Sequence, residues 1–561
     1  MRGIVTVLSF TAVSVTVGLM LCLIGGSLNT IIAGASLILG LGAGFWVWRD
    51  LGKIKLSRPS IGIFEKFMFF SWGLFCFRHF FWLYFQNGSG MWTLDRHNFG
   101  DLSQHITFIN YIARGVNYWP NEPFFVDGKF HYPFGMDFLA AYFVNFGLSL
   151  AQILPITGLI FGITTAMALF WWGGGLGMAA FLFSGGTAGY KFLTSGILAD
   201  YQADIAWKNL ALTILVPQRG FLFALPAGIV LIWAWQKRFL ENTPKFPFYI
   251  EGLLWGLMPL FQFHTFIFLS SLVAIWTLAT KSYNHAMRLF AWAFIPATIE
   301  TWYLTGGFHE ASIIWFKRGW MIGDENIFKF FWVNFGAFVI LFGWVLYIAL
   351  KRKIKYELLV VIPSLCILLF SFFVMMAPWE WDNIKIILWA YLLPMPLVAN
   401  YFAEYINSRW LSFVYLVLFL SGTVVTFYSL NPDGGGYELF RRDEMEEVCA
   451  TLNEIPPDTR IATGQTYNHP VSLCGHGVVA GYEGYLWSHG INSKVVSQKL
   501  KDLMLGTPQW RLTAKDLGVR YIYWGTQEKK DFGTSLRPWE TEAKLLSSNR
   551  WGNLFYLGDT P

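Results

Sequence analysis

The sequence predicts an α-helical polytopic membrane protein with about 13 transmembrane helices and a small C-terminal extracytoplasmic α/β domain. Hydrophobic residues make up 55% of the 561 residues and charged residues only 14%, with a mean hydropathy of +0.44. The charged residues are unevenly distributed along the chain. In 431–561, 30 of the 131 residues are charged, whereas in the first 430 residues only 46 are. This composition excludes a cytosolic globular protein, a disordered protein and a disulfide-rich scaffold.

Apolar runs in the first 430 residues define the candidate membrane spans, each needing about 20 residues. They are 4–25, 29–48, 62–85, 150–173, 175–190, 219–236, 249–263, 265–280, 286–305, 327–350, 356–376, 386–402 and 410–430. The first span is expected to be an anchor and not a cleaved signal peptide, because a second span follows at once. The pair 249–263 and 265–280 is short for two crossings, which favours a re-entrant or half-crossing hairpin buried in protein.

Lysine and arginine clusters predict the orientation of these spans. They follow the second, sixth and tenth spans and comprise Arg49, Lys53, Lys55, Arg58, Lys237, Arg238, Lys351, Arg352, Lys353 and Lys355. All of them lie on one side if the N-terminus is cytoplasmic, and residues 86–149 and 431–561 then lie outside. The first 430 residues carry a net charge of +8 and the tail carries −2, which gives the total of +6. It is not a clustered basic face on a soluble domain, so no nucleic-acid partner is expected.

The sequence therefore divides into three expected domains. They are two additional transmembrane helices with a cytoplasmic loop (1–60), a transmembrane domain with a large outer loop at 86–149 (61–430), and the extracytoplasmic α/β domain (431–561). The outer loop is rich in aromatic residues, and two interfacial helices are expected in it, at 101–114 and 135–148.

The tail after residue 430 combines short β-like runs with helical stretches near 439–452 and 508–517. Gly518 ends the second stretch and an apolar run follows at 521–524, which is an αβ pattern. The glycine-rich stretch 432–436 is interpreted as a hinge. Cys449 and Cys474 are the only cysteines of the tail. In an oxidising compartment they either pair or stay free, because sequence does not supply the geometry.

The most prominent polar cluster runs from Gly100 to His105 in the outer loop. On a helix Asp101 and His105 lie one turn apart on one face. A carboxylate and an imidazole so placed can act as a base or bind a divalent cation such as Mg²⁺ or Mn²⁺. Asp95 precedes this pair and Asp137 follows it in the same loop. The alternative is that these are solvated loop residues and helix caps.

A second group of charged residues lies at the expected outer ends of the spans. Arg219, Arg318 and Lys385 could receive the phosphate of a lipid carrier. The alternative is interfacial snorkelling, or ion pairing with Asp382 and Glu325. His264 is interpreted as a satisfied buried histidine in preference to a ligand. We find no P-loop, dinucleotide fingerprint, zinc motif or nucleophile elbow.

Several strings resemble an uncharacterised bacterial branch of the C-type (GT-C) membrane glycosyltransferases, which use polyprenyl-phosphate sugars. They are Gly100–His105 with Tyr132-Pro133-Phe134 and Asp137, Pro217-Gln218-Arg219, Phe263-His264-Thr265, 381–385 (WDNIK), 468–472 (NHPVS) and 481–490 (GYEGYLWSHG). The resemblance runs from about residue 60 to the end of the chain. This sequence lacks the adjacent acidic pair that some branches of the family carry in the first outer loop.

The resemblance implies transfer of a sugar from a polyprenyl-phosphate donor to an acceptor on the outer face of a bacterial inner membrane, with inversion. Asp101 would be the base, with Asp95 second and His105 assisting or completing a cation site. Arg219, Lys385, Arg318 and Gln218 would bind the donor phosphate. The implied substrate-binding residues are Asp382, Trp381, Tyr132, Asp137, His264, His469, Tyr482, Glu483 and Trp487. The acceptor is a glycan, a lipid or a protein.

Two other functions are compatible with the same pattern. The first is a catalytically silent GT-C-like scaffold or a subunit of an envelope complex, with a membrane-complex partner. The second is a secondary transporter, which the sequence disfavours because it has neither matched halves nor helices broken at equivalent places. For the tail residues, packing of the domain is an equally good interpretation as substrate binding.

Overall fold

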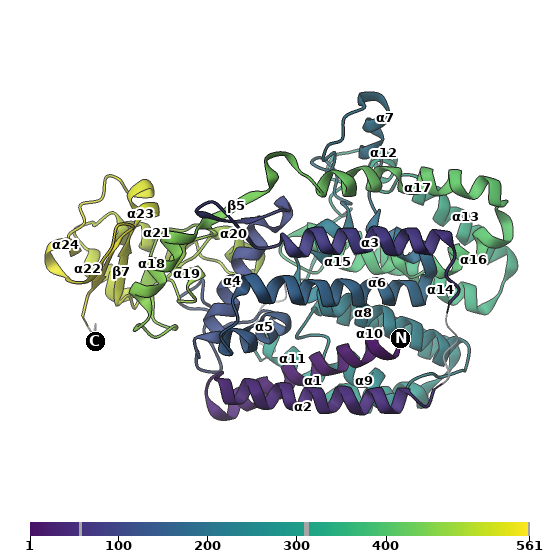
Figure 1. The fold of residues 1–561 in the computed structure, drawn as a ribbon, viewed down its shortest axis with the longest axis horizontal. Coiled ribbons are helices and arrows are strands. Elements are labelled where there is room, and N and C mark those ends of the chain that lie inside the picture. The colour runs from purple at the N-terminus through teal and green to yellow at the C-terminus, as the bar shows by residue number, and fades with distance from the viewer. Residues whose placement is uncertain (55–58, 308–313, 559–561) are drawn as a thin grey trace. The chain divides into compact units, whose positions relative to one another are not determined.

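The computed structural model describes residues 1–54, 59–307 and 314–558, so Lys55 and Arg58 of the predicted basic cluster lie outside the described residues. These residues are mostly helical (Figure 1) and form two compact units. The helical unit comprises Met1–Ser14, Ile38–Leu83 and Pro155–Gly435, and the α/β unit comprises Val15–Leu37, Tyr84–Leu154 and Gly436–Pro561. The boundary between Gly435 and Gly436 falls in the stretch interpreted as a hinge. The domain limits expected from composition stay a prediction.

The helical unit contains the long apolar helices. They are α1 (Arg2–Gly25), α2 (Thr30–Leu51), α3 (Ile63–Phe81), α6 (Leu150–Leu182), α8 (Arg219–Trp235), α9 (Phe248–Gly256), α10 (Phe263–Thr280), α11 (Tyr283–Leu304), α12 (Ile327–Phe335), α13 (Ala337–Arg352), α14 (Lys355–Ser371), α15 (Ile384–Leu392), α16 (Met395–Tyr405) and α17 (Ser408–Ser429). Short elements complete it, namely the helix α7 (Phe192–Ser195) and the strands β3 (Trp315–Phe316) and β4 (Val374–Met375). Helices α1, α2 and α6 contribute residues to both units.

Among the described residues, seven helices are long and apolar enough to cross a membrane, or up to eight if one bent pair counts as a span. The expected number of about 13 is therefore not confirmed. The predicted spans 150–173 and 175–190 correspond to the two parts of α6, which kinks at Gly174 (φ +60°, ψ −155°), and the second part ends at Leu182. The predicted span 327–350 is bent by 97° between α12 and α13. Gly336 occupies this break with φ +55°, a conformation that glycine adopts without steric cost.

The predicted hairpin at 249–280 is unequal in its two arms. Helix α9 has nine residues, which reach only about 13 Å at 1.5 Å per residue, so it is too short to cross a bilayer. Helix α10 has 18 residues and is long enough. This asymmetry agrees with the half-crossing interpretation, in which the short arm is buried in protein. Ile250, Glu251 and Leu254 of α9 are buried.

Helices α3 and α6 pack antiparallel along their length (Figure 1) because small residues of α6 face large ones of α3. A Cβ at Gly158 would lie 2.2 Å from the Phe80 ring, and one at Gly175 would lie 2.6 Å from the Phe64 ring. Such close helix contact through glycine is typical of membrane helices, where backbones approach through small side chains.

The α/β unit joins the outer loop to the tail. The loop supplies α4 (Phe99–Ala113), α5 (Gly135–Asn145), β1 (Phe85–Asn87) and β2 (Gly90–Thr93). The tail supplies β5 (Tyr437–Arg441), α18 (Arg442–Leu452), β6 (Ile461–Ala462), α19 (Pro470–Leu473), α20 (Glu483–Ser488), α21 (Lys494–Met504), α22 (Trp510–Asp516), β7 (Tyr521–Trp524), α23 (Thr526–Asp531), α24 (Trp539–Glu542), β8 (Lys544–Ser548) and β9 (Asn553–Tyr556). The helices expected at 101–114 and 135–148 are α4 and α5.

Two sheets organise the α/β unit. One has the order β1-β2-β5 and is antiparallel, so the tail's first strand extends the hairpin of the outer loop. The helix expected from 439 therefore begins only at Arg442. The other sheet has the order β6-β7-β9-β8, with β6 and β7 parallel and the remaining pairs antiparallel. The expected αβ pattern is confirmed, since Gly518, with φ +63°, follows α22 and precedes β7.

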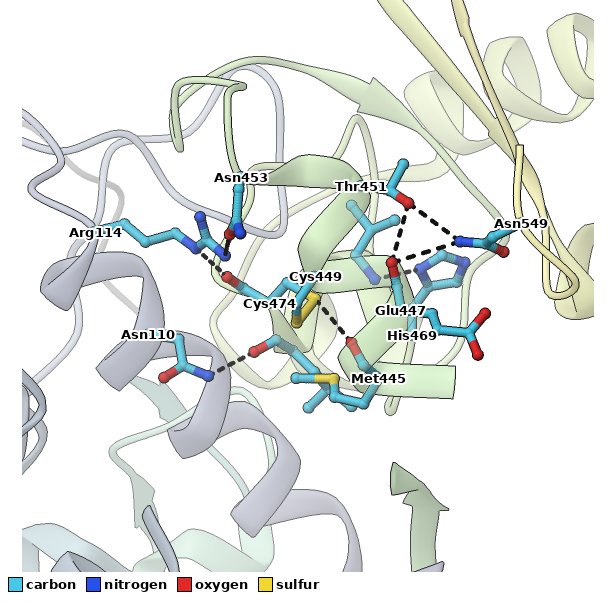
Figure 2. The surroundings of a disulfide bond; sticks show 12 residues. Asn110, Arg114, Met445, Glu447, Cys449, Thr451, Asn453, His469, Cys474 and Asn549 are labelled. Carbon is cyan, nitrogen blue, oxygen red and sulfur yellow. Dashed lines mark hydrogen bonds between the residues drawn. A yellow bond between two sulfur atoms is a disulfide. The ribbon is translucent and has the colours of Figure 1, made fainter. Parts of the chain in front are cut away.

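Cys449 and Cys474 form a disulfide, which decides the alternative that the sequence left open. They join α18 to the end of α19 within a core of buried residues that includes Val448, Val471 and Leu554. Figure 2 shows the side chains of Asn110 in α4 and of Arg114, which follows α4, on the same region of the tail. Asn110 donates to the carbonyl of Leu473, and Arg114 donates to the carbonyl of Cys474. The disulfide therefore stabilises the part of the tail on which α4 packs.

The loop segment 123–126 pairs with the tail segment 478–481 through backbone hydrogen bonds. Val126 donates to Val479 at 2.9 Å and Gly481 donates to Phe124 at 2.8 Å. Glu122, just before this segment, is only 2% exposed, and burial raises the pKa of its carboxyl to about 8. Arg460 of the tail donates to the backbone carbonyl of Glu122, so the two segments are also joined by a side chain.

We expect the stability of the α/β unit to fall as the pH rises from about 4.5 to about 8. The folded unit keeps a proton on Glu122 over this range, whereas the unfolded chain releases it, so raising the pH favours unfolding. Glu122→Gln should flatten this dependence and stabilise the unit at pH 8, as measured by thermal unfolding of the full chain at several pH values. Glu454→Gln, an exposed carboxylate of the same unit, is the control. A pH dependence unchanged in Glu122→Gln would contradict this.

Candidate functional site

The N-terminal half of α4 presents a row of polar side chains on one face. Asp101, Gln104 and His105 occupy positions i, i+3 and i+4, which are neighbours on a helix surface. Asp101 is half-buried, whereas Gln104 and His105 are only 6% and 3% exposed. The same-face arrangement predicted for Asp101 and His105 follows directly from the helix that the structure forms here.

Helix α5 supplies a carboxylate to this row. Asp137 lies in the first turn of α5, is 1% exposed, and places its Oδ2 2.8 Å from Nδ1 of His105. The ring of Tyr132, which precedes α5, lies edge-on to His105 with 6.2 Å between ring centroids. A carboxylate on one ring nitrogen fixes the orientation of the imidazole and leaves the other nitrogen for a second contact.

The tail segment 482–490 packs against the same face of α4. His489 lies 3.0 Å from Gln104 through its Nε2 and 5.1 Å from Tyr132 between ring centroids. The hydroxyl of Tyr485 donates to the carbonyl of Gly100 at 2.7 Å. Burial first, and then the negative charge of Asp101, hold the pKa of Tyr485 well above its ordinary value, so this hydroxyl stays a donor. Sequence reasoning did not single out Gln104 or Tyr485 as site residues, although Gln104 has the helical spacing that identifies the row.

Two aromatic side chains of this tail segment are exposed. Tyr482 is 41% exposed and Trp487 is 53% exposed, and Glu483 between them is also exposed. All three belong to α20 or immediately precede it. Exposed aromatic rings beside carboxylates can stack on the apolar faces of sugars while polar groups bind hydroxyls.

Asp95 and His469 have local structural contacts. Asp95 is 7% exposed and accepts a hydrogen bond from the backbone of His97, which caps the short turn before α4. His469 is 1% exposed, and its Nε2 lies 2.8 Å from the carboxylate of Glu528. Glu528 also accepts hydrogen bonds from the backbone of Gly464 and Gly525. His469 thus joins segments of the tail to one another, which agrees with the interpretation of the tail residues as packing residues.

The described residues contain no group of three or more His, Cys, Asp and Glu side chains that could hold a metal ion. Asp101 and His105, the ligands predicted for Mg²⁺ or Mn²⁺, lie one turn apart on α4, and Nδ1 of His105 faces Asp137. The donor set of this part of the chain does not fit a divalent cation that needs several oxygen ligands. We therefore derive no chemical step through a metal.

In the helical unit, the string Pro217-Gln218-Arg219 lies against the turn before α10. Arg219 opens α8 and is 2% exposed, and Gln218 precedes it as the N-cap residue. A Cβ on Gly220 would lie only 2.1 Å from the carbonyl oxygen of Phe261. Phe223, one turn further, stacks on the Phe261 ring at 3.8 Å between centroids. The start of α8 is therefore packed directly on this turn.

The string Phe263-His264-Thr265 follows that turn and lies close to the string at 381–385. His264 interacts electrostatically with both Lys385 and Asp382. Thr265 accepts a hydrogen bond from Trp389 of α15 at 3.2 Å. Three of the strings that carry the family resemblance thus meet in the helical unit, although they are far apart in sequence.

Lys385 forms an ion pair with Asp382 at 3.0 Å, as the alternative interpretation expected. The side chains of this pair are 13% and 15% exposed, so the charges are largely shielded from solvent. Trp381 is buried and donates to the carbonyl of Ala206 at 2.9 Å. Arg318 is exposed, and its neighbour Lys317 pairs with Glu380.

Sequence reasoning missed Glu300 of α11. It is 4% exposed and accepts a hydrogen bond from the backbone of Leu260 at 3.0 Å, within the turn that meets the start of α8. A carboxylate in an apolar helix is costly unless it has a partner and a role. Glu300 is the single acidic residue of α11, and this isolation was the signal available in the sequence.

We expect Gly220→Ala to destabilise the helical unit by about 1–3 kcal/mol, because the new methyl group overlaps the Phe261 carbonyl and must displace α8 or the turn. Thermal unfolding of the full chain measures the effect. Gly343→Ala in α13 is the matched control, since nothing lies within 4 Å of a Cβ there. Equal stability of the two variants would contradict the close contact.

No family model and no curated protein matches this chain. Its chain trace is similar to solved structures of the Archaeoglobus fulgidus oligosaccharyltransferase. The structure tethered to an acceptor peptide containing the NVT sequon has a TM-score of 0.47 at 12% identity, over 82% of this chain and 69% of that one. The structure of archaeal AglB with an inhibitory peptide and a dolichol-phosphate has a TM-score of 0.46 at 12% identity, over 83% and 70%. At 12% identity, this likeness is one of chain trace only.

Proposed function

We propose that this protein transfers a sugar from a polyprenyl-phosphate-linked donor to an acceptor on the outer face of a bacterial inner membrane. The observation that supports this most is the polar face of α4, where Asp101 is half-buried beside His105, and Asp137 orients the imidazole. Buried acid and base groups of this kind are arranged where a proton must be moved. The family resemblance of the strings that meet in each unit supports the same proposal.

In the proposed reaction, Asp101 accepts the proton of an acceptor nucleophile as that atom attacks the anomeric carbon of the donor sugar. A new glycosidic bond forms, and the bond from the anomeric carbon to the carrier phosphate breaks. The electron pair of that bond leaves with the polyprenyl phosphate. A single displacement of this kind inverts the anomeric centre. His105, held by Asp137, positions the carboxylate and the acceptor.

The departing phosphate gains negative charge in the transition state, and cations that meet this charge lower the barrier. We assign this role to Arg219, a buried guanidinium at the start of α8. Lys385 contributes less, because Asp382 already compensates part of its charge. Gln218 and Arg318 would contact the phosphate from the adjoining segments, and Trp381 and His264 would line the site. Tyr482, Glu483 and Trp487 would contact the acceptor or its sugar.

The test compares envelope extracts of a native strain, a deletion strain and a complemented deletion strain by mass spectrometry. We expect one polyprenyl-phosphate sugar to accumulate in the deletion strain while one envelope product loses that sugar, which identifies donor and acceptor together. Complementation should reverse both changes. An envelope defect without any change in lipid-linked sugars would favour the scaffold function instead.

A further inference from the structure

An apolar groove of about 200 Å³ lies in the helical unit between α1, α2 and α9. These three helices lie in the lower part of Figure 1. Its lining consists of Ser9, Ala12, Val13, Ala43, Trp46, Val47, Tyr249, Ile250, Leu253, Leu254 and Leu257. These residues present almost entirely hydrocarbon to the groove. The site proposed for glycosyl transfer uses none of them, so the groove needs a separate explanation.

One end of the groove is basic. The guanidinium of Arg49 lies 4.5 Å from the ring centroid of Trp46, which lines the groove. The hydroxyl of Tyr249, another lining residue, donates to Asp50 at 3.0 Å, and Asp50 pairs with Lys53 at 2.9 Å. These contacts place a cationic cluster where the apolar lining ends.

Arg2 joins the same end. Its Nε donates to the carbonyl of Trp48 at 2.6 Å, and its guanidinium lies 3.8 Å from the ring centroid of that tryptophan. Among the described residues that these contacts join, Arg2, Arg49 and Lys53 stand against one carboxylate, Asp50, which leaves an excess of two positive charges. Leu253, Leu254 and Leu257 continue the lining with apolar side chains.

An apolar channel with a cationic mouth is complementary to a lipid with a negatively charged head and a hydrocarbon chain. We propose that this groove binds one acyl chain of an anionic glycerophospholipid, with its phosphate at Arg49 and Lys53. The cluster belongs to the basic side that sequence assigns to the cytoplasm, where anionic head groups attract lysine and arginine. The lipid would fill the space between α2 and α9 and join the two N-terminal helices to the rest of the unit.

Native mass spectrometry of the delipidated full chain, titrated with phosphatidylglycerol or phosphatidylcholine in detergent, tests this proposal. We expect phosphatidylglycerol to bind more tightly than phosphatidylcholine. Arg49→Gln should weaken the binding of phosphatidylglycerol roughly fivefold, which is the loss of affinity expected for one surface cation. Arg409→Gln, an exposed arginine of α17 outside the groove, should leave binding unchanged.

A second pair of variants tests the hydrocarbon part of the groove. Leu253→Trp fills the groove and should abolish the bound lipid, whereas Leu278→Trp, on an exposed position of α10, should not. Equal affinity for the two phospholipids, or retention of lipid in a folded Leu253→Trp variant, would overturn the proposal. Displacement of phosphatidylglycerol by a polyprenyl phosphate would overturn it too, because the occupant would then be the carrier. No arm of this experiment depends on glycosyl transfer.

Discussion

Asp101→Asn is expected to lower glycosyl transfer by roughly 100- to 10,000-fold, the usual contribution of a positioned general base. The amide keeps the size and the hydrogen-bonding reach of the carboxylate but does not accept the acceptor's proton at neutral pH. Asp101 is half-buried at the start of α4, so the exchange should leave the fold intact. Mass spectrometry of the lipid-linked sugar, with the variant present at native membrane level, measures the loss.

Asp127→Asn provides the matched control for this experiment. Asp127 is an exposed carboxylate of the same outer loop, and we expect its amide to support transfer at the native rate. If Asp101→Asn also transferred the sugar at the native rate, Asp101 would not be the base. If both variants were inactive while correctly inserted, the loop as a whole would be required and the assignment to one carboxylate would fail.

Removal of the disulfide is expected to destabilise the α/β unit by about 3 kcal/mol, the loop-closure contribution for two cysteines separated by 25 residues. The effect should extend to α4, because Arg114 binds the carbonyl of Cys474 and Asn110 binds that of the preceding residue. Pulse proteolysis of the full chain in increasing denaturant, comparing Cys449→Ser/Cys474→Ser with the native protein, measures the change.

Two comparisons make this measurement specific. Cys366→Ser in α14 removes a free thiol of the helical unit and should leave the α/β unit unchanged. Reduction of the native protein should reproduce the double variant. An α/β unit equally resistant to proteolysis with and without the disulfide would contradict the expected stabilisation.

Local pattern predicted much of the secondary structure correctly. The helices expected at 4–25 and 29–48 are α1 and α2, because continuous apolar runs fix both their position and their length. Asp101 and His105 share a face because a spacing of four residues in a helix has that consequence wherever the helix lies. The disulfide was recognised as one of two possibilities, since only two cysteines lie in the tail.

Errors arose where glycine sets the path of the chain. The second predicted span, 175–190, ends at Leu182 after the kink at Gly174, and Gly336, expected inside a span, bends it by 97°. Both glycines have positive φ. The surroundings of the two glycines differ. A Cβ at Gly336 would contact Thr187, which is 149 residues earlier, whereas nothing lies within 4 Å of one at Gly174.

The sequence by itself determined that the chain is apolar and helical over its first 430 residues, that a more charged tail follows, and which polar strings could carry chemistry. Only the tertiary structure decided that the outer loop and the tail fold as one unit, that Asp137 faces His105, and that Gly220, Phe261 and Glu300 meet around one turn. Apolar periodicity is a local property that a single helix expresses alone. Contacts between residues separated by 30 to several hundred positions depend on packing, which no local pattern encodes.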